Sequence, residues 1–145
     1  MRMSHSAAYA VNAALQLAKN GRQTPVSCGR LAENGHMPER FLLQVLRGLA
    51  KQGILYSVRG GTGGFCLGRN PQDISLLELV EAVDGPISSG LPANSSLPVE
   101  PARLLQDTLA GVVEATRRQL AAMKLSVLAA QFPTPDGNGH AKMTL

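Results

Sequence analysis

The stretch that decides the fold is YSVRGGTGGFCL, residues 56–67. Its four glycines and one arginine lie between two short segments rich in branched and aromatic residues, Ile54–Val58 and Phe65–Leu67. Glycine permits the positive φ angles of tight turns, and the flanking composition favours β-strands. The pattern therefore predicts an antiparallel hairpin with Arg59 at its tip, which is how a wing looks in a sequence.

A glycine-rich loop can also bind a nucleotide through its amide groups. The Gly-Lys-Ser/Thr ending of a P-loop is absent here, and no Gly-x-Gly-x-x-Gly arrangement opens a helix. We therefore favour the wing over a nucleotide-binding loop.

Two short helical patterns precede the hairpin and are separated by Asn34–Met37. The first contains Leu31 and Ala32 and has Ser27 as a good N-cap residue. Two short helices joined by a tight turn and followed by a hairpin are typical of a helix-turn-helix with a wing.

The second helical pattern, Pro38–Gln52, is the best-defined element of the chain. At about 100° per residue, its two faces differ in character. The apolar side holds Phe41, Leu42, Val45, Leu46 and Leu49, and the opposite side holds Arg40, Leu43, Gln44, Arg47 and Lys51. The helix alone would equally suit an ordinary amphipathic surface helix, but its place before a wing favours a recognition helix.

The residue types on this face suit contact with DNA. Arginine pairs bidentately with guanine and glutamine with adenine in the major groove, while arginine and lysine also bind phosphates. The residues expected to contact DNA are Ser27, Arg30, Arg40, Leu43, Gln44, Arg47, Lys51, Ser57, Arg59, Gly60, Gly61 and Thr62.

Charge is unevenly distributed along a chain whose formal net charge is +4. Seven Lys and Arg stand against two acids in residues 22–69, whereas six acids stand against one Arg in residues 70–107. A basic segment in a helix-turn-helix context is expected to contact phosphates, although a solvated basic face would explain the charge alone. The opposite signs suggest different partners for the two halves.

Length and composition restrict the class of protein. A chain of 145 residues that is 44% hydrophobic can bury one modest core, so we expect one domain with an appendage. No apolar run approaches the roughly 18 residues of a membrane span, and no secretory signal is recognisable, which predicts a cytoplasmic protein. The only cysteines, Cys28 and Cys66, are too far apart in sequence for a metal knuckle.

The remaining segments frame the helix-turn-helix. A stripe of small residues predicts a first helix over Ser6–Lys19, and the capping box of Ser75 and Glu78 predicts another that reaches about Asp84. We expect residues 1–85 to form the winged helix-turn-helix domain. Residues 86–101, rich in Pro, Ser and Gly, are expected to form a flexible linker.

Apolar residues then recur at steps of three and four, which predicts one long helix over Ala102–Ala130 within a dimerisation segment, residues 102–131. Such a helix is about 40 Å long and exceeds what the small domain covers. We favour a second subunit as its cover over folding back onto its own domain. The expected interface residues are Leu105, Leu109, Val112, Thr116, Leu120, Met123 and Val127, and the tail, 132–145, is expected to be disordered.

The order of these parts resembles the Rrf2 family of bacterial transcriptional regulators. The resemblance covers most of residues 1–85. It rests on Met1-Arg2, Tyr9-Ala10, Pro25-Val26-Ser27, Leu31-Ala32, Phe41-Leu42, Gln44, Leu49, Gly53, Ser57-Val58-Arg59-Gly60, Gly63-Gly64-Phe65, Leu67, Ile74-Ser75-Leu76-Leu77-Glu78 and Ala82-Val83-Asp84-Gly85. The resemblance implies a mainly α fold with a small β-hairpin, and a homodimeric winged-helix DNA-binding protein whose long C-terminal helix crosses to its partner.

The chain departs from the family pattern in two ways. Many members hold an iron–sulfur cluster through three cysteines in the loop before the dimer helix, whereas residues 85–101 contain none, so we expect no cofactor and no metal. Ser6, Ala7 and Ala8 stand where members often have basic residues, and Leu43 replaces a common acid.

Without a cluster, sensing must use another input. Cys28 follows the Ser27 cap at a helix N-terminus, where a stabilised thiolate would serve as an oxidation sensor, although a plain structural thiol is the simpler alternative. Cys66 is expected to pack inside the wing. An unidentified small molecule or protein is the other candidate effector.

These features predict a transcriptional regulator, a repressor that binds a twofold-symmetric operator as a dimer. The alternative is a winged-helix module that docks on a metabolic enzyme without binding DNA. We expect no enzyme activity, because His5, His36 and His140 lack partners at ligand or catalytic-triad spacing.

Overall fold

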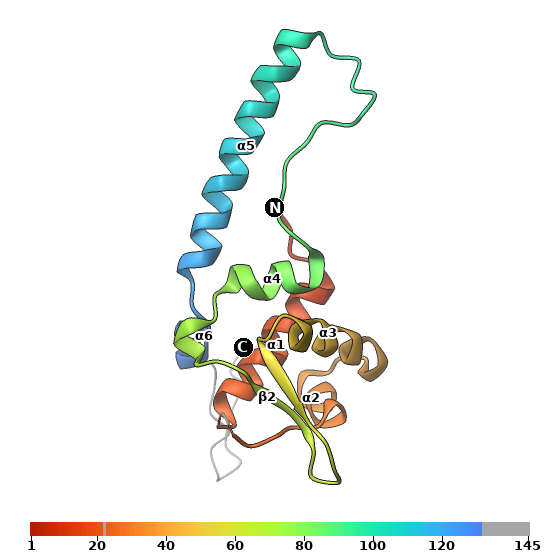
Figure 1. Ribbon diagram of the computed structural model, residues 1–145, viewed down its shortest axis with the longest axis vertical. Coiled ribbons are helices and arrows are strands. Elements are labelled where there is room, and N and C mark those ends of the chain that lie inside the picture. Colours follow the sequence, from red (N-terminus) through yellow and green to blue (C-terminus); the bar gives the residue numbers. More distant parts are fainter. Residues whose placement is uncertain (22, 132–145) are drawn as a thin grey trace, which may run out of the picture.

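Helices and one hairpin form the described part of the chain (Figure 1). The computed structural model describes residues 1–21 and 23–131. The elements are α1 (His5–Lys19), α2 (Cys28–Gly35), α3 (Glu39–Lys51), β1 (Leu55–Val58), β2 (Gly64–Leu67), the 3-10 turn η1 (Pro71–Asp73), α4 (Leu76–Asp84), α5 (Val99–Ala122) and α6 (Leu125–Gln131). None of the helices in these ranges combines the length and the apolar character that a membrane span needs.

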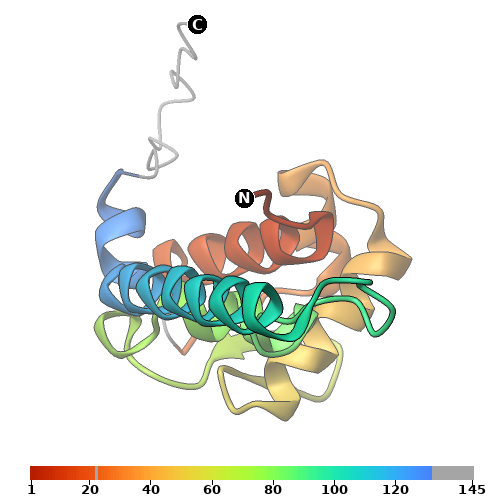
Figure 2. The same cartoon turned by 90° about the horizontal axis from the view of Figure 1, so that it is seen from above.

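The core forms around α1. Four of its alanines, Ala7, Ala10, Ala13 and Ala14, are fully buried, and such small side chains let other helices approach closely. Helices α3, α4 and α6 all contact α1. Seen from above, α2 and α3 lie at one end of this assembly and α6 at the other (Figure 2).

Local capping signals set the helix ends close to where the sequence places them. The Arg30 N–H donates to Ser27 Oγ at 3.2 Å, and Ser75 and Glu78 form the expected capping box. Helix α1 begins one residue earlier than expected, at His5, because Ser4 caps it. Helix α2 continues through Gly35, so the turn before α3 is shorter than the expected Asn34–Met37 segment.

The glycine-rich stretch forms the expected antiparallel hairpin. Leu55 pairs with Leu67 at its base and Val58 with Gly64 near its tip. The hairpin is joined to the entry of α2 by two backbone hydrogen bonds between Val26 and Phe65, at 2.8 and 3.0 Å. The wing and the helix-turn-helix therefore form one unit.

The sequence predicted a single long C-terminal helix, and this prediction is wrong. Helix α5 starts earlier, at Val99, and ends at Ala122, because Met123 is extended (φ −84°, ψ 111°). The Met123 carbonyl accepts a hydrogen bond from the Leu76 N–H, and the Leu125 N–H donates to the Ile74 carbonyl, both at 2.8 Å. These bonds to the start of α4 replace helical ones and turn the chain.

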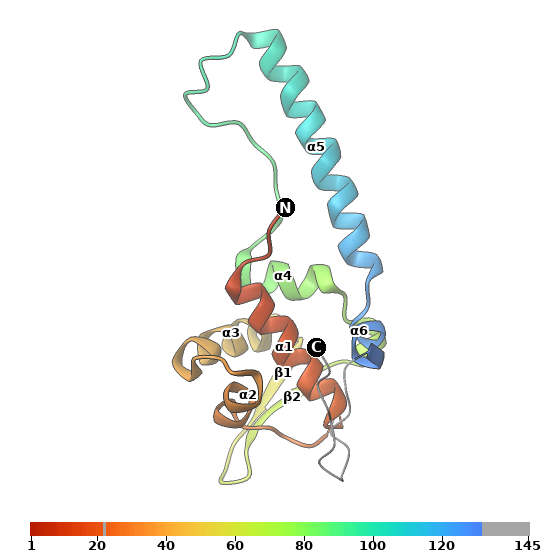
Figure 3. The same cartoon turned by 180° about the vertical axis from the view of Figure 1, so that it is seen from behind.

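Helix α6 then packs back onto the domain through Leu125 and Ala129, which are buried. Helix α5, in contrast, has no buried residue and extends away from the hairpin, as Figure 3 shows from behind. Met123 and Val127 therefore do not continue the α5 stripe, since Met123 lies at the break and Val127 lies on α6, 53% exposed. The predicted disordered tail lies outside the described residues.

Candidate nucleic-acid interface

Three elements gather at the end of the molecule opposite α5: α2, α3 and the hairpin (Figures 1 and 3). Their packing explains this grouping, since α2 contacts α3 and α3 contacts β1. The structure thus brings together the elements from which all the predicted DNA contacts come.

Helix α3 divides into a buried and an exposed face, largely as predicted. Leu42, Val45, Leu46 and Leu49 are buried. Arg40, Gln44, Arg47 and Lys51 are exposed, while Leu43 is half-buried. The exposed side chains run along one side of the helix, as contact with a DNA groove requires.

Phe41 was predicted on the buried face, and this is wrong. It lies at the border of the apolar stripe and is 40% exposed. Its ring meets the Tyr9 ring edge-on, with centroids 5.7 Å apart and an interplanar angle of 80°. One turn of α3 therefore presents an aromatic ring to solvent beside the polar face.

Cations at this end of the molecule have no acidic partner among the described residues. Side chains without an ion pair or hydrogen bond there are Arg30, Arg40, Arg47, Lys51 and Arg59. Arg69 and Arg103, by contrast, are paired, Arg69 with Glu78 at 2.6 Å and Arg103 with Glu100 at 2.9 Å. The unpaired cations are available to an external anion.

The wing tip carries the remaining predicted contacts. Ser57 lies on β1, and Arg59, Gly60, Gly61 and Thr62 form the turn, all exposed. A side chain added at Gly60 or Gly61 would meet nothing within 4 Å. The tip is narrow and open, as entry into a groove requires.

Ser27 lies at the first turn of α2. Its Oγ accepts from the Arg30 N–H, which leaves the hydroxyl proton for an outside acceptor. A helix N-terminus with exposed amide groups attracts anions, so Ser27 and Arg30 suit a phosphate.

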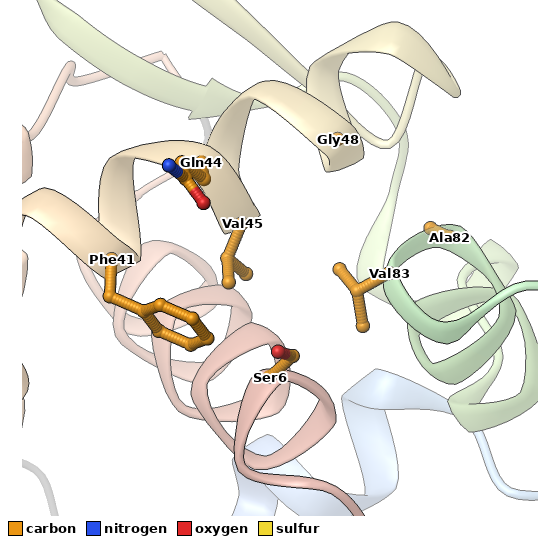
Figure 4. Close-up of a pocket in the computed structure, with 7 residues that line it drawn as sticks. All are labelled: Ser6, Phe41, Gln44, Val45, Gly48, Ala82 and Val83. Atoms are coloured by element: carbon orange, nitrogen blue, oxygen red, sulfur yellow. The ribbon is translucent and has the colours of Figure 1, made fainter.

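A hollow of about 180 Å³ lies beside the reading face, between α1, α3 and α4. Figure 4 shows Ser6, Phe41, Val45 and Val83 directed toward it. Gln44 also lines the hollow, so its amide lies between the hollow and the exposed face of α3. No sequence pattern indicated this hollow, because its walls come from three separate helices.

The surroundings of Cys28 do not favour the stabilised thiolate that the sequence suggested as one alternative. Burial, and then the neighbouring Glu39 carboxylate, raise the pKa of the Cys28 thiol, outweighing the opposite effect of Arg47. The thiol lies 3.6 Å from the Glu39 carbonyl oxygen, to which it donates. Cys66 is buried in β2, as expected.

The predicted interface residues of α5 differ in exposure. Leu105 and Val112 are exposed, whereas Leu109, Thr116 and Leu120 are half-buried. Leu97, Val99 and Leu104 add exposed apolar surface near the start of α5, which the sequence stripe did not include.

The sequence also did not predict the ion pair between Glu81 of α4 and Arg117 of α5. The two residues are far apart in sequence and belong to no motif. Only the fold brings them together.

Comparisons with known proteins agree with this geometry. The sequence model of the Rrf2 family, described as an iron-dependent transcriptional regulator, matches residues 3–131. An rrf2-like HTH-type transcriptional regulator of Rhodobacter capsulatus is 38% identical over 96 residues, which cover 64% of this chain and 63% of that protein. The HTH-type transcriptional regulator CymR of Bacillus subtilis is 31% identical over 88 residues, which cover 61% of this chain and 64% of CymR. The matched region thus spans less than two thirds of either relative.

Solved structures show the same fold. The structure of CymR, the global cysteine regulator of B. subtilis, superposes with a TM-score of 0.76 at 26% identity, covering 92% of this chain and 99% of that one. The T. potens IscR structure has a TM-score of 0.72 at 24% identity, covering 90% of this chain and 88% of that one. With its sequence matched from residue 3 to 131 and its winged fold shared, the chain belongs to the Rrf2 family, whose members are DNA-binding transcriptional regulators and not enzymes.

Proposed function

We propose that this protein binds a specific, twofold-symmetric DNA operator as a homodimer and represses transcription in the cytoplasm. The observation that carries the proposal is the set of unpaired cations shared by α2, α3 and the wing tip. Phosphates are the anions that such a face meets on DNA. The alternative, docking on a metabolic enzyme without DNA binding, has no observation in its favour.

Helix α3 enters the major groove in this proposal. Arg40 and Gln44 lie one turn apart on its exposed face and reach base edges, while Arg47 and Lys51 lie further along, where they hold phosphates. Arg59 at the wing tip reaches a phosphate or the adjacent minor groove. Base reading and backbone contact thus fall to different side chains.

Dimerisation follows from the surface of α5. The helix has no buried residue, and Val112 at its middle is 58% exposed. Each Å² of apolar surface left in water forfeits about 25 cal/mol. A second α5 packed along the same face removes this surface from water and gives two reading faces for two half-sites.

The test measures binding of the full chain to DNA that flanks its own gene, by fluorescence anisotropy at several salt concentrations. Arg59→Ala should weaken binding to every sequence, whereas Gln44→Ala should reduce the preference for operator over unrelated DNA, each lost specific contact costing about 1–3 kcal/mol. Arg103→Ala is the matched control, because Arg103 is paired with Glu100 on α5. Equal affinities and salt slopes for all three variants and the wild type would contradict the assignment.

We further propose that the protein holds no iron–sulfur cluster of the family type. Such clusters need thiolate ligands, and the chain has one cysteine on α2 and one buried in β2. The segment between α4 and α5 offers Ser88, Ser89, Ser95 and Ser96 in place of cysteines. Anaerobic purification followed by iron and sulfide analysis tests this, since stoichiometric amounts of both would refute it.

The effector is then a small molecule or a protein, and we assign Cys28 a structural role. Its raised pKa leaves little thiolate to react with an oxidant. If peroxide changes operator binding of the wild type but not of Cys28→Ser, this assignment is wrong and the thiol is a switch.

A further inference from the structure

Besides its packing against α4, two sets of polar contacts attach α5 to the rest of the molecule. One is the backbone bridge at the end of α5, where Met123 and Leu125 bond to the segment that starts α4. The other is the ion pair of Arg117 with Glu81, near the end of α4. Among the described residues, no other side chain of α5 makes an ion pair or hydrogen bond with the domain.

Glu81 binds both the outgoing and the returning part of residues 86–122, a segment that we call the arm. Its Oε2 accepts from the Ile87 N–H at 2.7 Å, where the chain leaves α4, and from Arg117 Nη1, where α5 returns. The Glu81 and Arg117 side chains are 20% and 34% exposed, the lowest pair of values among the ion pairs of the described residues. One carboxylate oxygen thus ties the outgoing and returning segments together.

Two separated polar attachments restrain the direction of a helix more tightly than one attachment does. Arg117 and Met123 lie about 9 Å apart along the chain of α5. From Arg117 to Val99 the helix extends about 27 Å further without a buried residue. A tilt of about 10° at the base moves the far end by about 5 Å, which exceeds the spacing of one base pair, about 3.4 Å.

We propose that Glu81 is a positioning residue that fixes the direction of α5 and thereby selects the spacing between operator half-sites. This proposal rests on the proposed function, because α5 must join two reading domains for its direction to set their separation. The reading residues themselves stay unchanged, so loss of Glu81 should alter spacing preference and leave recognition of a single half-site intact.

The direction of α5 is measured first, without DNA. Nitroxide labels are attached at two exposed positions, Gln72→Cys on η1 and Gln106→Cys on α5. They report the distance between these two positions within one chain. The measurement uses the full chain with Cys28→Ser, diluted with unlabelled chain. Glu81→Gln and Arg117→Gln should each broaden the distance distribution relative to the wild type, because one of the two polar attachments is lost.

Three variants serve as controls. Arg118→Gln and Glu114→Gln remove one charge from exposed positions of α5 and should leave the distribution as in the wild type. Arg117→Lys keeps the charge and should retain most of the narrow distribution. An unchanged distribution in Glu81→Gln would overturn the proposal, whether or not the protein binds DNA.

Operator spacing is measured second. The wild type should prefer one half-site spacing over spacings one base pair longer or shorter. Glu81→Gln should reduce this preference by about twofold to fivefold, the contribution of a partly exposed ion pair, with unchanged affinity for a single half-site. A broadened distance distribution with unchanged spacing preference would overturn the role in operator selection. If the wild type binds no DNA, the proposed function fails, and the distance measurement still decides whether Glu81 directs α5.

Discussion

Replacing Gly64 with alanine should separate the wing from the helix-turn-helix. Gly64 has φ +153°, and a Cβ there would lie 2.3 Å from the Val26 carbonyl oxygen and 2.7 Å from the Ser27 nitrogen. These are backbone atoms and do not yield as a flexible side chain does. The two Val26–Phe65 hydrogen bonds must therefore break, at about 1 kcal/mol each, and the strained φ adds about 1–3 kcal/mol. The expected loss in the free energy of unfolding is about 3–5 kcal/mol.

Urea unfolding followed by circular dichroism measures this loss, and two glycines provide controls. A side chain at Gly61 in the wing tip or at Gly111 in α5 meets nothing within 4 Å. Gly61→Ala should change the unfolding free energy by less than about 0.5 kcal/mol, and Gly111→Ala should raise it by up to about 1 kcal/mol. A loss below about 1 kcal/mol for Gly64→Ala would refute the reasoning, because strain alone costs that much.

Three further substitutions test other parts of the structure. Val112→Asp should lower the dimer fraction in sedimentation equilibrium while the helical circular dichroism signal persists, and an unchanged dimer would place the interface elsewhere. Leu125→Ala should cost about 2–5 kcal/mol in urea unfolding, because the fully buried side chain attaches α6 to the domain; a loss near zero would contradict that packing. Burial alone raises the pKa of Glu78, but hydrogen bonds from Ser75 and Arg69 outweigh this effect and lower the pKa below 4.5. Ionised Glu78 therefore stabilises the fold above pH 4.5, and this stability is lost as the pH falls through the lowered pKa. Glu78→Gln should therefore unfold more easily than wild type at pH 7 and differ less from it at pH 3, and an equal difference at both pH values would refute this assignment.

Features set by neighbouring residues were predictable from the sequence. The hairpin follows from glycines between branched residues, and the starts of α2 and α4 follow from Ser27 and Ser75 as caps. The exposed face of α3 follows from helical periodicity, since its apolar residues are numerous enough to fix which side is buried. Each of these signals acts within about one helical turn or one hairpin.

Features set by contacts between distant segments were not predictable. The break after Ala122 has no proline or glycine to announce it, and the apolar period continues through it. It arises because Met123 and Leu125 form backbone bonds with residues some fifty positions earlier. Cys28 shows the same limit: the helix N-terminus favours a thiolate, whereas burial and then Glu39, both consequences of the fold, raise the pKa of the thiol.

The fold changes the interpretation of the charge distribution along the sequence. Opposite charges in the two halves of the sequence suggested two kinds of partner, one for each half. Most acids of residues 70–107 are instead engaged within the molecule, so this segment does not present its full negative charge to a partner. The cations of α2, α3 and the wing form no ion pair among the described residues, so their charge stays available to the phosphates of DNA. The engaged acids are Glu78, Glu81 and Glu100, in ion pairs, and Asp84, which accepts from Ser4.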